Sequence, residues 1–347
     1  MKRILVIFTG GTIASGFQGK TKIAGPDANN FESLHKNLKE FFIDKAIDEI
    51  IFCKPLGIPG KDSSNIHPGH WLKITALIVN ELQKGLDGVL ILYGTDTMAY
   101  LSAWLKICFP KISIPVILTG SQLTLDYLPG DVMVNLRGAA QAICSNFTGI
   151  WIYCNWKLFP GDRTHKGHAL HPDIFTALNS MPVYFNPEWA LKKDNALKIS
   201  KKFKCSSNID KIMNYEEGKA QDIYKRIGWI MCAPGIKPTT LSGHERILCI
   251  YGFGAGNAPT EVLDYLRVFY NGKKKPNIIA CSQAEGDMKK PNHYDKVGIA
   301  LLAKDGFKVW SQMDYPIEFI HSLACFALLS SFNSPGKILS KYLKERF

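Results

Sequence analysis

Residues 3–13 read Arg-Ile-Leu-Val-Ile-Phe-Thr-Gly-Gly-Thr-Ile, an apolar run that ends in a glycine turn. A short apolar run with a glycine boundary is typical of a buried strand that leads into a turn. The two glycines let the backbone bend sharply and let a ligand approach main-chain N–H groups. We therefore expect the hydroxyl of Thr12 to project into a crevice beyond the strand end. The alternatives are a ligand-free turn and a phosphate-binding loop, and the Gly-Lys-Ser/Thr ending of a phosphate loop is missing here.

The same rhythm, a short β-branched run followed by Gly, Thr or Ser, recurs along the chain. Helix-length segments separate the runs, which are Arg3–Phe8, Gly88–Leu92, Val116–Leu118, Ile150–Tyr153, Ile227–Met231, Arg246–Tyr251 and Asn277–Cys281. Strands that alternate with helices predict a mostly parallel α/β sheet. In such a sheet the functional crevice lies beyond the carboxyl ends of the strands, so polar residues at those ends are candidates for a site.

The chain is long enough for two domains, with 347 residues. From about Leu191 to Ile223 its composition turns to Lys, Ser, Asn, Asp and Glu without a strong period, as in an inter-domain connection. We predict an α/β fold with a larger N-terminal, mostly parallel sheet domain over residues 1–205. A linker over 206–221 and a smaller C-terminal α/β domain over 222–347 would follow.

The bulk composition disfavours several classes of protein. Hydrophobic residues make up 46% and charged residues 21%, as in ordinary globular enzymes. Nine scattered cysteines without a C-x-x-C pair indicate free thiols in a reducing cytoplasm rather than disulfides or a zinc site. The net charge of +12 gathers in lysine-rich segments that lack the interleaved aromatics of a nucleic-acid groove. We expect a cytoplasmic protein with no metal, no nucleic-acid partner and no membrane association.

A second polar motif, Tyr93-Gly94-Thr95-Asp96-Thr97, follows the run Gly88–Leu92. Thr and Asp are ordinary N-cap residues, but one helix needs only one cap, so the surplus favours a functional site. Lys166 follows a later run, and a lysine beside an aspartate in a polar crevice can help to move a proton. A threonine hydroxyl is a poor nucleophile at neutral pH and needs such help. Thr95, Asp96 and Lys166 supply the parts of a proton relay.

Taken together, these motifs resemble those of the L-asparaginase family. Thr9-Gly10-Gly11-Thr12-Ile13, Gly94–Thr97 and the Arg163-Thr164-x-Lys166 pattern stand in the family's order. Three further matches resemble its cytoplasmic, type I branch, namely Lys61–Ser64, Thr119–Gln122, and Tyr251-Gly252 with Gly256–Pro259. The motifs span most of the chain, and their combination is highly specific. The resemblance implies hydrolysis of L-asparagine to L-aspartate and ammonia, with no metal or organic cofactor.

The same resemblance implies catalytic roles. Thr12 would be the primary nucleophile, and Thr95, Asp96 and Lys166 would form a second, activating triad. Family members are homodimers or homotetramers whose sites are completed by the neighbour's C-terminal domain.

Substrate-binding roles also follow from the resemblance. Asp62 and Ser63 would hold the α-amino and α-carboxylate groups, and Asp96 would also reach the amine. The full set of implied substrate-binding residues is Gly11, Asp62, Ser63, Thr95, Asp96 and Ser121. Asn257 would be the contribution from a neighbouring protomer.

The sequence departs from the family at two positions. The mobile lid of the family carries a catalytic tyrosine, whereas the segment Ala14–Gly25 offers only Lys20, Thr21 and Lys22. Tyr93, the first tyrosine of the chain, stands where the family usually has histidine. We therefore hypothesise that Tyr93 takes over some of the proton transfer of the lid tyrosine and that the lid mainly excludes water.

Other functions remain as alternatives. Glutaminase and a tRNA-dependent amidotransferase-type amidase would use the same chemistry, although the latter usually has an extra N-terminal domain. The missing lid tyrosine also fits a non-catalytic amino-acid-binding homologue, but such a protein does not need Thr12, Thr95, Asp96 and Lys166 together. A nucleotide-binding function would rest on Gly252–Gly256 alone.

Overall fold

The computed structural model describes residues 2–18, 21–43, 45, 47–127, 130–145, 147–185, 207–215, 217–237, 241–284, 298–343 and 345–346. The chain forms two compact units, residues 1–209 and 210–347. Each unit contains a largely parallel sheet with helices, so the predicted α/β class is confirmed.

The first unit contains most of the secondary structure. Its strands are β1 (Arg3–Phe8), β2 (Ser15–Gln18), β3 (Thr21–Pro26), β4 (Glu49–Cys53), β5 (Gly88–Leu92), β6 (Pro115–Thr119), β7 (Gly149–Cys154), β8 (Lys157–Pro160), β9 (Thr164–Lys166), β10 (Phe175–Ala177) and β11 (Val183–Tyr184). Its helices are α1 (Ala28–Phe42), α2 (Pro68–Gln83), α3 (Thr95–Cys108) and α4 (Val132–Ile143), with the short 3₁₀ helices η1 (Thr12–Ala14) and η2 (Ser63–Asn65).

The main sheet has seven strands in the order β11-β8-β7-β6-β5-β1-β4. The five strands from β7 to β4 pair in parallel, and β8 and β11 are antiparallel additions at one edge. β1 lies between β4 and β5, so the chain leaves β1 first toward one edge and then toward the other. A parallel sheet has its topological switch point at such a place, here between the ends of β1 and β5.

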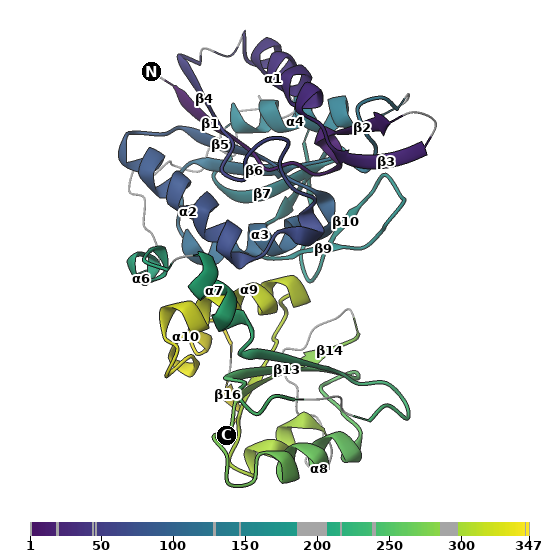
Figure 1. The fold of residues 1–347 in the computed structure, drawn as a ribbon, viewed down its shortest axis with the longest axis vertical. Coiled ribbons are helices and arrows are strands. Elements are labelled where there is room, and N and C mark those ends of the chain that lie inside the picture. The colour runs from purple at the N-terminus through teal and green to yellow at the C-terminus, as the bar shows by residue number, and fades with distance from the viewer. Residues whose placement is uncertain are drawn as a thin grey trace. The chain divides into compact units, whose positions relative to one another are not determined.

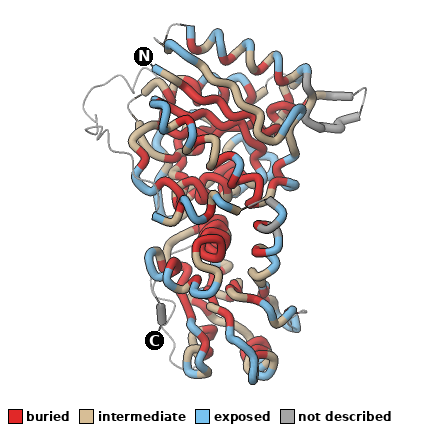
Figure 2. Tube along the Cα trace, turned by 60° about the vertical axis from the view of Figure 1, so that its left-hand side comes forward, coloured by how far each residue is buried: buried red, intermediate tan, exposed pale blue. Residues whose placement is uncertain are grey.

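Helices cover both faces of this sheet, α1 and α4 on one and α2 and α3 on the other (Figure 1). The apolar side chains of α1 recur at helical spacing (Phe31, Leu34, Leu38 and Phe42) and pack with α4 and alternate residues of β1 and β5. Figure 2 shows inner strands of this sheet as buried along most of their length, and β1, β5 and β6 are buried at nearly every residue. The carboxyl ends of the strands therefore rest on a closely packed core.

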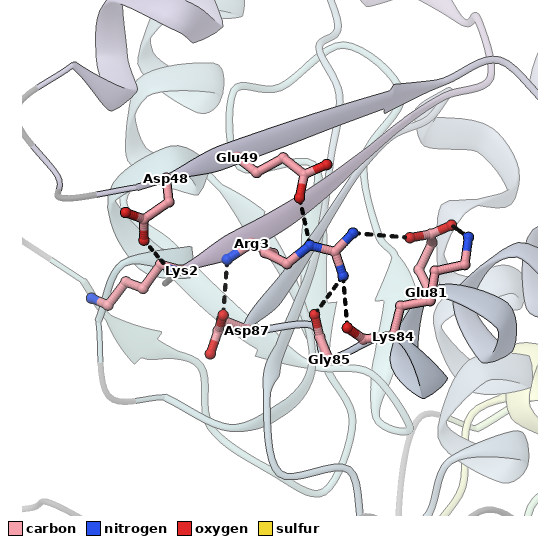
Figure 3. A network of polar contacts seen from close by, with 8 residues as sticks. All are labelled: Lys2, Arg3, Asp48, Glu49, Glu81, Lys84, Gly85 and Asp87. Carbon is pink, nitrogen blue, oxygen red and sulfur yellow. Dashed lines mark hydrogen bonds and ion pairs between the residues drawn. The ribbon is translucent and has the colours of Figure 1, made fainter.

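The amino end of β1, opposite the candidate site, is tied by charges to its neighbours (Figure 3). The Arg3 side chain reaches Glu49 on β4 at 2.5 Å and Glu81 on α2 at 3.6 Å, and donates to the carbonyl of Gly85 at 2.8 Å. The hydrogen bond with Glu49 raises the pKa of Arg3 above its usual value. Its main-chain N–H also donates to Asp87 before β5 at 2.8 Å. The start of β1 is thus held to β4, α2 and β5.

The second unit has a five-stranded sheet in the order β12-β13-β14-β15-β16, with only β16 antiparallel. Its strands are β12 (Ile227–Met231), β13 (Ile247–Gly252), β14 (Asn277–Ser282), β15 (Lys308–Ser311) and β16 (Glu345–Arg346). Its described helices are α7 (Glu217–Tyr224), α8 (Thr260–Phe269), η4 (Ile299–Ala303), α9 (Ile317–Ser330) and α10 (Gly336–Leu339), and α6 (Ile209–Met213) begins at the boundary between the units. This unit has an apolar core of its own.

The predicted linker overlaps two helices, α6 (Ile209–Met213) and α7 (Glu217–Tyr224). The preceding part of the polar segment, residues 186–206, lies outside the described residues. The proposed domain limits at 205 and 222 stay predictions. Within the described ranges, no helix is long and apolar enough to cross a membrane.

Candidate active site

The two polar motifs follow β1 and β5, which are neighbours in the sheet. Gly10 and Gly11 adopt positive φ angles of 107° and 85°, which L side chains rarely adopt. A Cβ on Gly10 would lie 2.5 Å from the main-chain N and O of Lys61. The amide of Lys61 donates to the carbonyl of Thr9 at 2.8 Å, and the amide of Gly11 donates back to Lys61 at 3.0 Å. The glycine turn is therefore held against the loop that contains Asp62.

Close backbone packing brings a third loop to the same place. A Cβ on Gly11 would lie 2.5 Å from Gly94, and a Cβ on Gly94 would lie 2.6 Å from the hydroxyl of Ser63. Three segments that are far apart in the sequence therefore meet at the switch point, with Thr12 next to Gly11 and Thr95 next to Gly94. Among the described residues, no hydrogen bond joins the Thr12 hydroxyl to Thr95 or Lys166.

Lys166 joins the second motif from β9. Its ammonium donates to Thr95 Oγ1 at 2.9 Å and to Asp96 Oδ1 at 2.5 Å. The side chain of Lys166 is 18% exposed and that of Asp96 is 60% exposed, so the pair lies at the rim of the fold. The cap of α3 is Gly94, which makes no side-chain cap bond. The side chains of Thr95 and Asp96 thus meet Lys166 instead of capping the helix.

The loop with Asp62 and Ser63 is also fixed in place. Asp62 caps η2 by accepting bonds from the amide and hydroxyl of Ser64 at 2.8 and 2.6 Å, both at Oδ1. Asp62 is exposed, whereas Ser63 is buried and its carbonyl accepts a bond from the hydroxyl of Thr97 at 2.8 Å. The Ser63 hydroxyl therefore lies next to Gly94, and the residue before it in the chain carries the exposed carboxylate of Asp62.

The end of β6 contributes a residue that sequence reasoning missed. The carboxamide of Gln122 accepts a bond from the Thr95 hydroxyl at 3.3 Å. The predicted substrate residue Ser121 is buried and donates its hydroxyl to the carbonyl of Leu123 at 2.6 Å. Asp131 was also missed, and it accepts the amides of Gln122 and Leu123 at 2.8 and 3.0 Å. The motif Thr119–Gln122 was the signal available in the sequence, but only the tertiary contact shows what its glutamine touches.

The hypothesis about Tyr93 is contradicted by the structure. Its side chain is fully buried, and its hydroxyl contacts Thr97 Oγ1 at 3.2 Å and accepts a bond from the Trp71 indole at 3.4 Å. Because Thr97 already donates to Ser63, Tyr93 must donate to Thr97. Burial raises the pKa of Tyr93 to about 12. Tyr93 therefore belongs to a hydrogen-bond chain under Ser63 and does not stand in for a lid tyrosine.

The lid segment forms the β2–β3 hairpin, in which Gly16 pairs with Gly25. Lys20 and the side chains of Thr21 and Lys22 lie outside the described residues. Asn257 lies in the second unit, in a tight turn where it and Phe253 exchange main-chain hydrogen bonds of 2.7 and 2.8 Å. Over the described ranges, no group of three or more His, Cys, Asp or Glu side chains could hold a metal ion.

Comparison with known proteins gives matches over most of the chain. Residues 3–195 match the family described as asparaginase, N-terminal. The L-asparaginase of Thermococcus kodakarensis is 27% identical over 285 residues, covering 81% of this chain and 80% of that protein. A glutamyl-tRNA(Gln) amidotransferase subunit from Methanothermobacter thermautotrophicus is 26% identical over 273 residues, covering 75% of this chain but only 58% of the relative. The chain thus spans less than two thirds of the length of that relative.

The fold agrees with solved structures. The thermostable L-asparaginase from Thermococcus kodakarensis superposes with a TM-score of 0.71 at 23% identity, covering 97% of this chain and 96% of that chain. At this identity the likeness concerns the fold, and it extends over both units.

Proposed function

The chain belongs to the asparaginase family, and we propose from this membership that it is an amidohydrolase that converts L-asparagine to L-aspartate and ammonia. The observation that carries the proposal is the Lys166 ammonium, which bridges Thr95 and Asp96 at 2.9 and 2.5 Å. This group lies at the same strand ends as the glycine turn before Thr12. A nucleophile candidate and a proton relay at one switch point fit amide hydrolysis.

In the proposed reaction the Thr12 oxygen attacks the side-chain amide carbon and forms an ester with the aspartyl group. The Thr12 proton passes toward the Thr95–Lys166–Asp96 group and on to the leaving nitrogen, which departs as ammonia. Water then cleaves the ester and releases aspartate. The amide of Gly11 is occupied by Lys61, so the first-turn amides of α3 are the better donors to the oxyanion.

The substrate groups have matching partners around this centre. Both hydrogen bonds to Asp62 use Oδ1, which leaves Oδ2 for the α-ammonium group of an amino acid. Ser63 offers a hydroxyl beside it, and Asp96 offers a second carboxylate near Thr95. Two carboxylates and a hydroxyl suit an amino acid better than a simple amide.

The proposal extends to compartment and assembly. Every cysteine in the described part of the chain is a free thiol, which fits a cytoplasmic protein. We propose a homodimer or homotetramer, and no cofactor is required by the chemistry above.

A second candidate is suggested by the amidotransferase relative. Such a protein would pass the ammonia to a partner protein instead of releasing it as a free product. The amide-cleaving residues would be the same, so the distinction lies in whether the chain turns over free L-asparagine by itself.

The test is ammonia release by the purified chain from L-asparagine, L-glutamine and simple amides, with Thr12→Ala as the control for contaminating activity. We expect L-asparagine to be turned over faster than L-glutamine. Equal or better turnover of glutamine, or no turnover of any amide by the chain alone, would contradict the proposed substrate.

A further inference from the structure

Gln122 makes a hydrogen bond at each end of its carboxamide. Its Nε2 donates to the carbonyl of Ala169 at 2.6 Å, and its Oε1 accepts from the hydroxyl of Thr95 at 3.3 Å. Thr95 and Ala169 belong to different elements, α3 and the β9–β10 connection. Gln122 is thus a bridge between two walls of the site.

The direction of both bonds follows from what each partner can do. A main-chain carbonyl only accepts, so the amide nitrogen of Gln122 must face Ala169 and its oxygen must face Thr95. The Lys166 ammonium only donates, so Thr95 Oγ1 accepts at 2.9 Å from that side. The Thr95 proton therefore points to Gln122, and an oxygen lone pair points to Lys166.

The base of Gln122 is held independently of this bridge. Its main-chain amide donates to Asp131 Oδ2 at 2.8 Å, and the next amide, of Leu123, donates to Oδ1 at 3.0 Å. Asn135 donates to the carbonyl of Gly120 at 2.9 Å from α4. These bonds fix the main chain on both sides of Gln122, so that only its side chain could still rotate. The two bonds of the carboxamide restrict that rotation.

The second bond acts on Lys166 through the chain. Ala169 lies three residues after Lys166, in the exposed connection closed by the amides of Gly167 and His168, which donate to the carbonyl of Ile174 at 3.0 and 3.1 Å. The bond to Ala169 therefore holds the connection that directly follows β9. One carboxamide thus contacts both the Thr95 hydroxyl and the connection that follows the lysine strand.

We propose that Gln122 is the positioning residue of the Thr95–Lys166 relay, an inference that rests on the proposed amidohydrolase function. Gln122 keeps the Thr95 oxygen turned toward Lys166, so that proton exchange between the two groups needs only a small rotation of one hydroxyl. It touches neither Thr12 nor the substrate groups in this assignment, and it acts through its neighbours.

Two substitutions separate the bonds. Gln122→Met removes both, whereas Gln122→Glu keeps an acceptor for Thr95 and loses the donor to Ala169. We expect Gln122→Met to lower kcat by about tenfold or more, the effect of one lost hydrogen bond in a transition state, with KM changed by less than about threefold. Gln122→Glu should recover most of the kcat at its optimum, with a pH profile moved upward by the added charge near Lys166. Gln141→Met, at a half-buried glutamine on α4, is the control and should leave kcat unchanged.

Amide hydrogen exchange gives a readout that does not depend on turnover. Both Gln122 variants should speed exchange at Gly167 and His168, because both lose the bond to Ala169. Equal losses of kcat in the two variants would mean that only the bond to Ala169 matters, and this would overturn the proposal. Unchanged kcat or unchanged amide exchange in Gln122→Met would overturn it as well. If the wild-type chain releases ammonia from no amide, the proposed function fails instead, and the exchange rates alone decide whether the bridge exists.

Discussion

At the residue scale, Lys166 and Lys157 are two lysines of similar burial that differ in the partners they contact. Their side chains are 18% and 17% exposed, and each forms an ion pair with an aspartate, at 2.5 and 2.8 Å. The bond from Lys157 lowers the pKa of Asp173, which is also bonded to Asn155, so this cluster is a structural ion pair. Lys166 has a hydroxyl as its second partner. A lysine that contacts a threonine hydroxyl at the switch point can exchange a proton with it, and this is the role that we propose for Lys166.

This comparison gives a matched test. Thr12→Ala and Lys166→Met should each lower kcat for ammonia release by on the order of 10²–10⁴-fold, because they remove the proposed nucleophile and relay. Lys157→Met removes an ion pair of similar burial and should leave kcat unchanged. Steady-state kinetics with circular dichroism of each variant checks this, and near-wild-type turnover by either site variant would refute the assigned roles.

Tyr93 yields a prediction about stability at alkaline pH. Burial raises its pKa to about 12 in the folded chain, against about 10 for an exposed tyrosine. The stability from its buried, neutral phenol is therefore complete below pH 10 and is lost as the pH rises to 12. The shift corresponds to on the order of 2–3 kcal/mol. Tyr93→Phe should lack this component, so its free energy of unfolding should fall less steeply over that range than that of the wild type.

Urea titrations at several pH values measure the effect, and Tyr184→Phe, at a 65% exposed tyrosine, is the control. Because the Tyr93 hydroxyl faces Trp71 and Thr97, we also expect kcat to fall by less than about tenfold, roughly 1.4 kcal/mol. A larger loss of kcat with KM unchanged would restore a catalytic role for this hydroxyl.

At the scale of elements, the two ends of β1 are built differently. The amino end is held by the charges around Arg3, and the carboxyl end by glycines that let backbones touch. A Cβ on Gly120, after β6, would lie 2.2 Å from the carbonyl oxygen of Tyr93, after β5. At the carboxyl end of β1, main-chain atoms of neighbouring segments are in direct contact, so an added Cβ could be accommodated only if those segments moved apart.

Gly120→Ala should therefore force the ends of β5 and β6 apart. We expect a loss of about 1–3 kcal/mol in the free energy of unfolding from overpacking. We also expect a fall of about 100-fold in kcat, since a displacement near 1 Å can cost that much. Gly218→Ala on α7, where a Cβ meets nothing within 4 Å, should be neutral or stabilising. Denaturant unfolding and ammonia release measure both effects, and a fully active Gly120→Ala protein would disprove the tight junction.

At the scale of the whole molecule, the chain divides into two units with separate cores. The residues of the proposed relay and the glycine junction lie entirely in the first unit, whereas the motif with Asn257 lies in the second. The proposal that a neighbouring copy completes the site gives the second unit a part in catalysis.

We expect light scattering to give two or four times the chain mass of 38.8 kDa at assay concentration. If Asn257 acts in a neighbour's site, mixed oligomers of Lys166→Met and Asn257→Ala chains should regain activity that neither variant has alone, because one site then carries neither change. A fully active monomer, or mixed oligomers without recovery, would count against shared sites.

The sequence by itself determined the α/β class, and it predicted the edge of the sheet at which a site would form. Both depend on local signals: apolar runs such as Arg3–Phe8 and Gly88–Leu92 became strands with those bounds, and the polar residues after them lie at the switch point. The pairing of Lys166 with Thr95 and Asp96 was expected from the family resemblance, and the structure brings the three side chains into contact.

Only the tertiary structure decided where side chains point and what they touch. Tyr93 was expected to face the site, but strand alternation places it with Ile91, on the side of the sheet that α2 and α3 cover, where Trp71 and Thr97 hold its hydroxyl. The bridge from Gln122 to Ala169 spans 47 positions. The physical reason is that a side chain's partners are set by which distant elements pack against it, and no local pattern contains that information.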